Sequence, residues 1–404
     1  MAEIRAASHP AEAEEFHEDI IYPGTIPFLL VHLACFGAIW TGVTVEALVI
    51  CVVLYVVRMF GVTAGYHRYF SHRSFKTSRA GQFVLALLAQ SSAQRGALWW
   101  ASKHRHHHRH SDTEIDVHSP KHHGFLYAHV GWIFSRRHEE ADYSTVPDLT
   151  KYPELVWLER HQYVVAAVLA VACFLFAGWS GLIVGFFWST VLLYHGTFMI
   201  NSLAHVHGKQ RYVTGDDSRN NWWLALITLG EGWHNNHHAY QRSTRQGFRW
   251  WEIDPTYYVL KMLSWVGLVW DLGEPPPEVV ANERRLGRKV VEKAAHQIAF
   301  TFPIERIAAQ VREAWANTPT WDEVVRRVRE AGEQAEAKIA ALHLPEMPEM
   351  PQLPSMDEIR RRVEQLFAHA PSVSMDEIAD RARQVLMEYV ALHLFDGPEA
   401  LPAT

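Results

Sequence analysis

The chain has 404 residues, of which 49% are hydrophobic, 20% charged and 12% aromatic, and its formal net charge is −6. This length predicts more than one domain, and the absence of a basic block leaves no support for binding to nucleic acid. The 26 histidines are the unusual feature of the composition. Three widely spaced cysteines in apolar runs exclude a disulfide scaffold and a CxxC zinc site.

Residues 1–22 are polar and acidic. They lack the basic start, apolar centre and cleavage site of a secretory signal, so no export signal is expected. Two pairs of apolar runs follow, each close to the ~20 residues that cross a bilayer. They predict four transmembrane helices over residues 26–42, 43–66, 163–179 and 181–200. A soluble core is disfavoured because a buried core helix rarely runs so long without charge.

The loop charges predict the orientation of these helices. The two short turns within the predicted hairpins contain no Lys or Arg, whereas the segment between the hairpins carries many. Because positively charged loops stay in the cytoplasm, the termini and the middle segment are expected there, in a multi-pass protein of a bacterial-type inner membrane. Two weaker apolar stretches, residues 82–100 and 256–272, are expected to be helices lying in the membrane interface.

The composition changes after residue 277 to Ala, Glu, Arg and Gln with helical periodicity. Three similar helix starts, at residues 320–323, 355–358 and 374–377, fit a capping box in which a hydroxyl accepts a bond from a first-turn amide. The expected organisation is therefore an N-terminal segment over residues 1–22, a membrane domain over 23–275 and a helical extension over 278–404. The extension is expected to be a degenerate repeat of solvated amphipathic helices.

Histidines gather in four boxes, and each box lies on the predicted cytoplasmic side. The boxes are HRYFSH at 67–72, HRHHHRHSD at 104–112, NSLAHVHG at 201–208 and EGWHNNHH at 231–238. Residues at i, i+3 and i+4 share a helix face, so the second and fourth boxes are each expected to aim three imidazoles at one point. His67 and His72 lie about 140° apart on an α-helix, so both can face inward only if the helix ends between them.

Imidazole binds iron, zinc, copper and nickel well. Nine candidate ligands exceed one coordination sphere, so two metal ions with four or five ligands each are predicted. A lone histidine near a membrane interface is usually a polar anchor, and His32, His129 and His195 are therefore assigned no role. The sequence thus predicts a cytoplasmic histidine-rich cap with two metal ions.

These boxes, together with HVGWIFSRRH at 129–138 and WWEIDPTYY at 250–258, resemble the membrane-bound acyl-CoA Δ9 desaturases of the stearoyl-CoA type. The resemblance covers roughly residues 22–275. It implies a diiron centre in which Asn201 joins through a water. The implied histidine ligands are His67, His72, His104, His107, His108, His205, His234, His237 and His238.

The resemblance also implies an acyl tunnel. In such enzymes, side chains of the second span close the blind end of the tunnel, and the matching positions are Tyr55 and Met59. Met59 is long where small residues accompany eighteen-carbon chains, which indicates a shorter pocket. Arg136 and Arg137 match a basic pair near the phosphates of coenzyme A, and Arg pairs suit phosphate geometry. However, Ser102-Lys103 replaces the Arg-Asp of the animal enzymes, so a phospholipid or carrier-linked acyl chain stays open.

The implied reaction is insertion of a cis double bond into a long-chain saturated acyl group, with two iron ions and O₂. Reduction of O₂ to water takes four electrons, of which the alkane supplies two. A separate donor of the ferredoxin, rubredoxin or cytochrome type is expected, because the chain contains no HPGG haem motif. The rivals are a membrane diiron hydroxylase and a histidine-rich metal transporter. A transporter would place ionisable groups near mid-bilayer.

Overall fold

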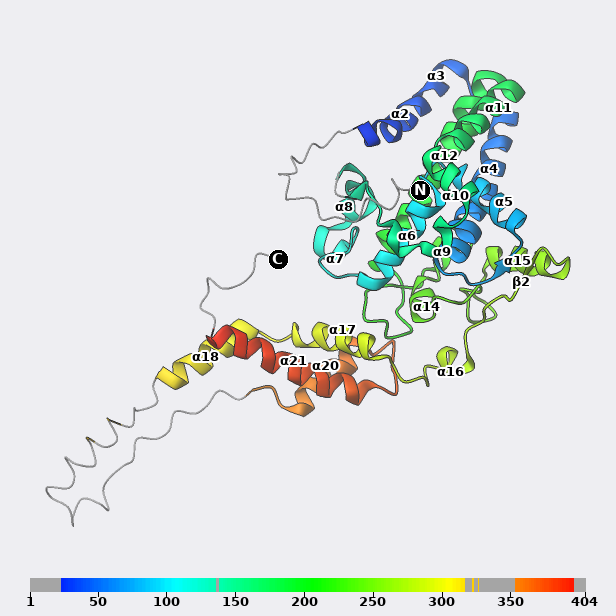
Figure 1. The fold of residues 1–404 in the computed structure, drawn as a ribbon. Coiled ribbons are helices and arrows are strands. Elements are labelled where there is room, and N and C mark those ends of the chain that lie inside the picture. Colours follow the sequence, from blue (N-terminus) through cyan, green and yellow to red (C-terminus); the bar gives the residue numbers. More distant parts are fainter. Residues whose placement is uncertain (1–22, 136–137, 317–321, 323–325, 327–352, 396–404) are drawn as a thin grey trace, which may run out of the picture. The chain divides into compact units, whose positions relative to one another are not determined.

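The computed structural model describes residues 23–135, 138–316, 322, 326 and 353–395. It is mostly helical, in agreement with the predicted all-α class (Figure 1). Within the described residues the two strands, β1 (Lys76–Thr77) and β2 (Val269–Trp270), form one short antiparallel pair. The chain divides into two compact units, Met1–Arg284 and Arg285–Thr404.

The first unit begins with a helical hairpin. Its elements are η1 (Pro23–Thr25), α2 (Ile26–Ala34), η2 (Cys35–Gly37), α3 (Ala38–Thr41), α4 (Val45–Phe60) and the π-helix η3 (Gly61–Ser71). The chain reverses at Gly42, whose φ of 72° lies in the left-handed region that glycine adopts without strain. The hydroxyl of Thr44 then accepts a bond of 3.2 Å from the N–H of Ala47 and starts α4.

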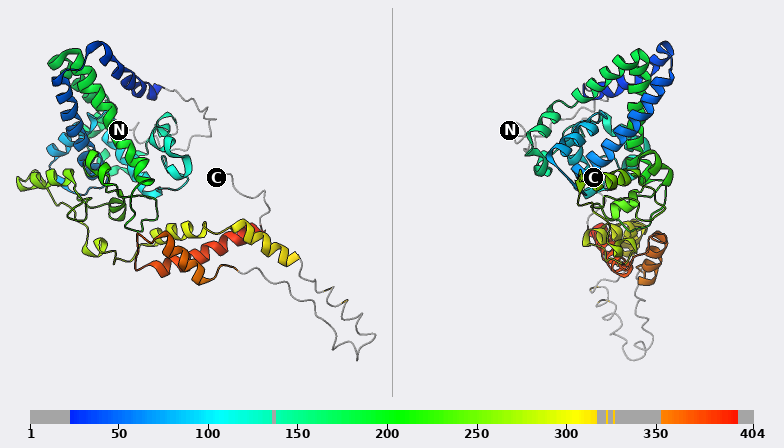
Figure 2. Two further views of the ribbon diagram at one scale, coloured as in Figure 1. Left: turned by 180° about the vertical axis from the view of Figure 1, so that it is seen from behind. Right: turned by 90° about the vertical axis from the view of Figure 1, so that its right-hand side faces the viewer.

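A second hairpin packs against the first. Its elements are α11 (Val164–Ser180), the π-helix η7 (Gly181–Trp188), α12 (Ser189–Asn201) and η8 (Leu203–His205). Ala177 and Gly178 have non-helical backbone angles, and Gly178 has a φ of 61°, so the chain reverses there. Both α11 and α4 pack along η7, and these helices lie side by side in both views (Figure 2).

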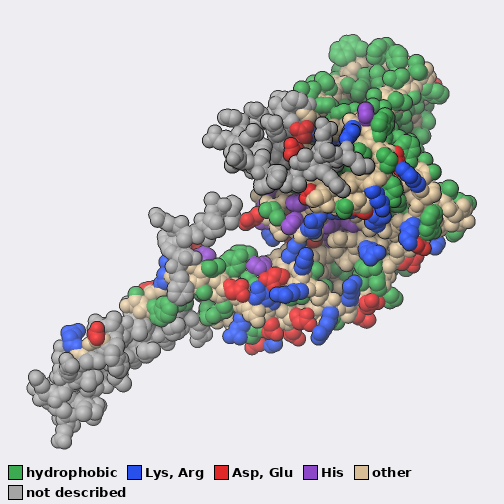
Figure 3. All heavy atoms as spheres, viewed as in Figure 1, with side chains coloured by type: hydrophobic (Ala, Val, Ile, Leu, Met, Phe, Trp, Pro, Cys, Tyr) green, Lys and Arg blue, Asp and Glu red, His purple; other side chains and the backbone are tan. Residues whose placement is uncertain are grey.

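The two hairpins expose apolar side chains along their outer surface. Two helical stretches, Val45–Ser71 and Val164–His205, are long and apolar enough to cross a membrane, and a shorter apolar helix spans Ile26–Thr41. Hydrophobic side chains cover the end of this unit that carries α3, α4 and α11 (Figure 3). Exposed apolar patches of this kind mark a surface that meets lipid or a partner. Four passes and a cytoplasmic cap stay predictions.

The segment between the hairpins forms a cap of short helices. These are α5 (Arg79–Gln90), α6 (Ala97–His110), α7 (Pro120–His123), α8 (Phe125–His129), η4 (Gly131–Phe134), η6 (Tyr143–Thr145), α9 (Pro147–Thr150) and α10 (Pro153–Arg160). The predicted helix over residues 82–100 is divided, because Ala93 and Arg95 have φ of 59° and 67° and cannot continue an α-helix. Buried Leu98, Leu155 and Leu158 join α6 and α10 in one core.

Short helices also follow the second hairpin. They are α13 (Trp222–Ile227), α14 (His234–Ala239), α15 (Pro255–Trp265) and α16 (Pro277–Val280). The predicted helix over residues 256–272 ends earlier, at Trp265, and the chain then forms β2. The carboxylate of Asp254 caps α15 by accepting a 3.0 Å bond from the N–H of Tyr257. Tyr258, Met262 and Trp265 are exposed on α15. The expected position of this helix in the membrane interface stays a prediction.

The second unit is a helical bundle. Its described helices are α17 (Arg288–Ala299), α18 (Ile304–Ala316), α20 (Met356–Leu366) and α21 (Met375–Phe395), and α21 packs against the other three. The predicted cap at residues 355–358 is confirmed, since Ser355 Oγ accepts a 3.2 Å bond from Glu358 N–H. At 374–377 the bond differs, because Ser374 Oγ accepts from the N–H of Leu286 at 3.0 Å. The predicted start at 320–323 lies outside the described residues, apart from Asp322.

The predicted boundary at residue 277 can be tested by truncation. Val279 packs with Tyr212 and Phe248 in the core of the first unit. A cut after residue 277 would remove Val279 from this core, so the truncated chain should end at Arg284 instead. We expect this variant to fold and to bind metal like the full chain, because it keeps all nine candidate ligands. Metal content and thermal unfolding of the two purified proteins check this. Loss of metal from the truncated chain would place the extension within the metal-binding fold.

Candidate metal centre

The nine histidines form two adjacent groups. Cluster A contains His67, His72, His104, His108 and His237, and cluster B contains His107, His205, His234 and His238. In each cluster, the ligand nitrogens all lie within 4.8 Å of one another. The described structure therefore brings together the nine histidines that the resemblance implies, as one group of five and one group of four.

Helices α6 and α14 each contribute to both clusters. On α6, His104 and His108 face cluster A and His107 faces cluster B. On α14, His234 and His238 face cluster B and His237 faces cluster A. The expectation that each box aims three imidazoles at one point is wrong. On an α-helix, residues four apart are separated by about 40° and therefore point the same way, as His104 and His108 do. The residue just before His108 is rotated by about 100° from it, so His107 points elsewhere.

His67 and His72 reach the same cluster through a π-helix. Helix η3 ends at Ser71, between the two histidines as the prediction required, and the N–H of His72 bonds to the carbonyl of His67 at 3.2 Å. This is the i→i+5 bond of a π-helix. The wider turn brings residues five apart close to one face, so both imidazoles face cluster A.

The ring nitrogens are too close together for hydrogen bonding to explain. His104 Nε2 lies 2.9 Å from His72 Nε2 and 3.0 Å from His108 Nε2. His237 Nε2 lies 2.9 Å from both His67 Nε2 and His108 Nε2. Each Nε2 offers either one proton or one lone pair, so a single Nε2 cannot make a full hydrogen bond to two such neighbours at once. Ligands at about 2.1 Å from an ion at right angles are about 3.0 Å apart, so the donor set fits a cation.

Four carboxylates stand behind the clusters and orient the imidazoles. Asp112 accepts a 2.8 Å bond from His205 Nδ1, Asp216 a 2.8 Å bond from His238 Nδ1 and Asp116 a 3.1 Å bond from His107 Nδ1. Glu231 accepts from His67 Nδ1. A proton held at Nδ1 leaves the Nε2 lone pair directed at the cluster. The sequence analysis missed these acids, although each lies within or close to a histidine box or the GDDS segment at 215–218.

The four carboxylates are held in their charged form. Burial alone would raise the pKa of Asp112, but the imidazole of His205 outweighs burial and lowers the pKa to about 2. The pKa values of Asp116 and Asp216 also lie well below the usual range, because His107 and His238 outweigh burial. His67 and Arg68 likewise lower the pKa of Glu231. Ionised carboxylates at these positions can accept the Nδ1–H bonds of the imidazoles and would stabilise a cation bound on the Nε2 side.

Replacing one of these acids should weaken metal binding without removing a ligand. In Asp216→Asn, the oxygen that faces His238 Nδ1 is retained but the charge is lost, so we expect metal affinity to fall about 10- to 100-fold at cluster B. Anaerobic titration of the apoprotein with ferrous ion measures this. The neighbouring Asp217→Asn is the control, because the Asp217 carboxylate lies 3.8 Å from Lys121 and is partly exposed. Equal affinities in the two variants would contradict the role of Asp216.

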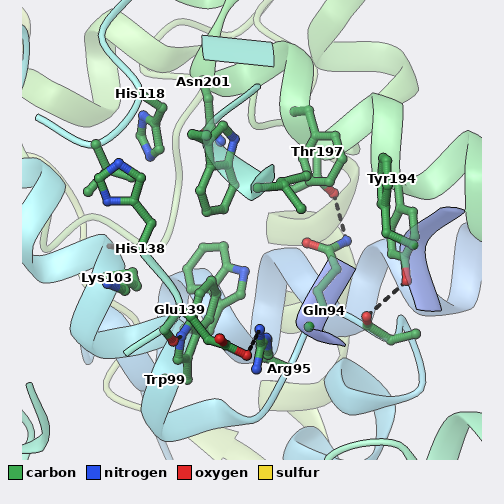
Figure 4. A pocket seen from close by; sticks show the side chains of 18 of the residues that line it. Gln94, Arg95, Trp99, Lys103, His118, His138, Glu139, Tyr194, Thr197 and Asn201 are labelled. Carbon is green, nitrogen blue, oxygen red and sulfur yellow. Dashed lines mark hydrogen bonds and ion pairs between the residues drawn. The ribbon is translucent and has the colours of Figure 1, made fainter. Parts of the chain in front are cut away.

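A cavity adjoins cluster A (Figure 4). Apolar and aromatic side chains form much of its wall, including Phe28, Trp99, Tyr194 and Phe198. His104, a member of cluster A, lines the same cavity. Asn201 also lies on the wall. The site thus combines clustered imidazoles with an adjoining and largely apolar space.

Polar contacts join the elements around this cavity. Gln94 Nε2 donates to Thr197 Oγ1 at 3.1 Å, and the Tyr194 hydroxyl donates to the carbonyl of Ala93 at 2.9 Å. Arg95 and Glu139 form an ion pair at 3.2 Å (Figure 4). These bonds tie α12 to the turn between α5 and α6 and fix the wall.

The sequence analysis assigned substrate contacts to Tyr55, Met59, Arg136 and Arg137. Tyr55 and Met59 are not among the side chains that line this cavity. They meet α12 at Gly196, where an added Cβ would lie 3.0 Å from Met59 Cε and from Tyr55 Oη. Arg136 and Arg137 lie outside the described residues. The predicted substrate roles of these four residues therefore stay predictions.

Comparison with known proteins identifies one family of enzymes. A family model described as fatty acid desaturase matches residues 44–266. An acyl-CoA 5-desaturase of Anemone leveillei is 39% identical over 252 residues, which are 60% of this chain and 77% of that protein. An sn-1 stearoyl-lipid 9-desaturase of Anabaena variabilis is 36% identical, over 62% of this chain and 92% of that protein. A probable acyl-CoA desaturase of Schizosaccharomyces pombe is 34% identical, over 69% and 60% of the two chains.

Proposed function

The chain belongs to the fatty acid desaturase family and is a fatty acyl desaturase, and we propose that it holds two iron ions and uses O₂ to insert a cis Δ9 double bond. The observation that carries this proposal is the place of His104, which belongs both to cluster A and to the wall of the cavity. An acyl chain in that cavity would lie beside the metal centre. The two named substrate classes of the relatives, acyl-CoA and acyl-lipid, both contain such a chain.

In this proposal, cluster A and cluster B each hold one iron ion, and Asn201 contributes through a water. Bound iron would supply the redox chemistry of O₂, which no amino-acid side chain provides. The overall reaction is R–CH₂–CH₂–R′ + O₂ + 2 e⁻ + 2 H⁺ → R–CH=CH–R′ + 2 H₂O. The two electrons come from a separate donor protein. The four carboxylates hold the Nδ1 protons, so that each paired imidazole keeps its orientation.

The cavity supplies binding and exclusion of water. Trp99, Tyr194 and Phe198 offer apolar surface to the methylene groups of the chain, and burial of each methylene contributes about 0.8 kcal/mol. The hydrogen bonds of Gln94 and Tyr194 fix this wall, so that one part of the acyl chain would be held beside His104. A fixed wall makes the position of the double bond a property of the site.

We propose acyl-CoA as the substrate, with Arg136 and Arg137 binding its phosphates. A phospholipid-linked chain is the alternative, and lipid desaturases occur among the relatives. A membrane diiron hydroxylase is a second alternative, because it would use a similar ligand set. A metal transporter is disfavoured, since the candidate ligands lie at the ends of apolar helices and in the cap.

The proposed topology is four membrane passes with the metal centre on the cytoplasmic side. The backbone reversals at Gly42 and Gly178 support it, because each divides an apolar region into two antiparallel helices. Neither turn carries Lys or Arg, which favours the outer side of the membrane. The histidine boxes would then all lie inside, in a bacterial-type inner membrane.

The chain-length prediction concerns Met59. If Met59 closes the tunnel, Met59→Ala opens room for a few methylenes at the methyl end, each contributing about 0.8 kcal/mol when filled. We expect the variant to favour eighteen-carbon over sixteen-carbon substrates relative to the wild type, with the double bond at the same distance from the carboxyl carbon. Competition assays with located double bonds measure both quantities. An unchanged preference would mean that Met59 only packs against α12, and a shifted double bond would mean that the chain is measured from its methyl end.

The direct test uses purified protein in lipid nanodiscs, loaded anaerobically with ferrous ion and supplied with O₂ and a reduced electron-donor protein. Saturated acyl-CoA and saturated phospholipid are tested in separate arms, and products are identified by mass spectrometry. We expect a monounsaturated acyl-CoA and no product without iron. Conversion of the phospholipid alone would replace the proposed head group, and a hydroxylated product would overturn desaturation.

A further inference from the structure

A line of polar side chains runs between helices that the sequence places in the membrane. His32 on α2 and His195 on α12 lie within predicted spans. His129 is the last residue of α8, and Ser202 directly follows α12. These residues belong to neither cluster A nor cluster B. Ionisable groups within membrane segments are costly to bury and usually serve a function. The interpretation of these histidines as isolated polar anchors is therefore incomplete.

The side chains form one continuous hydrogen-bonded chain. His195 is its centre, because each of its two ring nitrogens contacts a different histidine. The successive distances are 2.7 Å from Phe28 O to His32 Nδ1, 3.3 Å from His32 Nε2 to His195 Nε2, 3.0 Å from His195 Nδ1 to His129 Nε2, 3.0 Å from His129 Nδ1 to Ser202 Oγ and 3.0 Å from Ser202 Oγ to Phe198 O.

The Phe28 carbonyl at one end determines which ring nitrogens carry protons when all three histidines are neutral. The Phe28 carbonyl can only accept, so His32 carries a proton on Nδ1 and a lone pair on Nε2. His195 must then donate from Nε2, and its Nδ1 accepts from Nε2–H of His129. The hydroxyl of Ser202 finally donates to Nδ1 of His129. Every ring nitrogen has a partner in this arrangement.

A second arrangement holds one more proton and also satisfies the contact between Ser202 and the Phe198 carbonyl. His32 is then protonated on both nitrogens and donates to His195 Nε2. His195 donates from Nδ1 to His129, which donates from Nδ1 to Ser202 Oγ. The hydroxyl of Ser202 now donates to the Phe198 carbonyl, which is the contact at 3.0 Å. The Phe28 carbonyl is an acceptor in both arrangements and cannot pass a proton on, so the change between them runs through the Ser202 hydroxyl.

The surroundings leave this proton free to move along the chain. Among the described residues, the three rings contact no carboxylate that would hold the charge on one ring. The titratable group packed against them is Tyr194, whose ring centre lies 6.3 Å from that of His32 and whose hydroxyl donates to Ala93 O. A metal ion fits poorly here, since the two nitrogens of His195 point to different neighbours and the lone pairs do not converge.

We propose that the hydrogen-bonded line of His32, His195, His129 and Ser202 stores one proton and releases it at Ser202 for the reduction of O₂. The reaction given above takes up two protons beside a largely apolar cavity, and a group that supplies one of them acts as a general acid. Ser202 directly follows Asn201, which lines the cavity with Phe28 and Phe198. The destination of the proton rests on the proposed function, whereas its storage rests on the hydrogen bonds alone.

Storage is tested by solid-state NMR of the full-length protein in nanodiscs with ¹⁵N-labelled histidine. At high pH we expect a proton on Nδ1 of His32 and on Nε2 of His195 and His129. On acidification all three rings should change together as one proton binds. In His195→Phe, His32 and His129 should titrate independently, whereas His161→Phe, which removes an exposed histidine bonded to Trp157 O, should leave the joint titration intact. Independent titration in the wild type, or zinc bound tightly to these rings, would overturn the proposal.

Delivery is tested by turnover in H₂O and D₂O. We expect Ser202→Ala and His195→Phe to keep the iron content of the wild type, to lose turnover about tenfold or more and to show a larger solvent isotope effect. Ser202→Ala removes only one oxygen atom and should leave the fold intact, so a loss of turnover in this variant cannot be attributed to misfolding. Turnover and isotope effect equal to those of His161→Phe in both variants would overturn delivery. A joint titration in a protein without desaturase activity would instead reject the proposed function and leave the proton store standing.

Discussion

His237→Ala is expected to lower the iron content from about two ions per chain to about one and to remove most of the desaturase activity. The Nε2 of His237 lies 2.9 Å from the nitrogens of both His67 and His108, so its loss opens the centre of cluster A. His107→Ala should have the same effect through cluster B. Iron analysis of anaerobically reconstituted protein, followed by an activity assay, measures both quantities.

A histidine of the same boxes supplies the control. His207 is exposed and belongs to neither cluster, so His207→Ala should keep two iron ions and full turnover. Zinc can occupy histidine sites because imidazole discriminates poorly between these metals, so the metal content must be measured as iron. Full iron content and full turnover in His237→Ala would remove this residue from the ligand set.

Arg68→Met is expected to destabilise the protein by about 3–5 kcal/mol. The Arg68 side chain is 1% exposed and donates to Glu231 at 3.2 Å, to Asp254 at 3.1 Å and to the carbonyl of Thr244 at 2.7 Å. Met fills a similar volume but leaves two buried carboxylates without their counter-charge. Because Glu231 also accepts from His67, the variant should bind metal more weakly. Denaturant unfolding in detergent measures the free-energy change.

An exposed arginine provides the comparison. Arg79 pairs with Glu154 through bonds of 2.7 and 2.8 Å, and its side chain is 65% exposed. Exposed pairs contribute about 0–1 kcal/mol, so Arg79→Met should have little effect on the free energy of unfolding. Equal losses in the two variants would show that the buried position of Arg68 contributes nothing beyond a surface ion pair.

The sequence predicted which histidines gather but not how they divide. Helical spacing indicates that His104, His107 and His108 lie near one another, and the resemblance adds the remaining partners. The division between clusters depends on the direction from which the neighbouring helices approach α6 and α14, and one sequence carries no such information. The π-helical turn that unites His67 and His72 was also unpredicted, because nothing in the local composition marks it.

The acidic residues behind the imidazoles show a second limit. Asp112, Asp116, Asp216 and Glu231 lie in or near the boxes, where an acidic residue is usually solvated. Only the fold shows that they are buried and bonded to Nδ1 atoms. Positive φ at Ala93 and Arg95 likewise divided a predicted helix, since neither residue type favours that conformation.

The central claim is that the two histidine clusters support desaturation of a saturated acyl chain. Mass spectrometry of lipids from cells that express the wild type or His237→Ala, with double-bond position located, tests it most directly. The account predicts a new monounsaturated acyl chain with its double bond at carbon 9 in wild-type cells and none in the variant. A hydroxylated chain in wild-type cells, or the same unsaturated product from the variant, would contradict it.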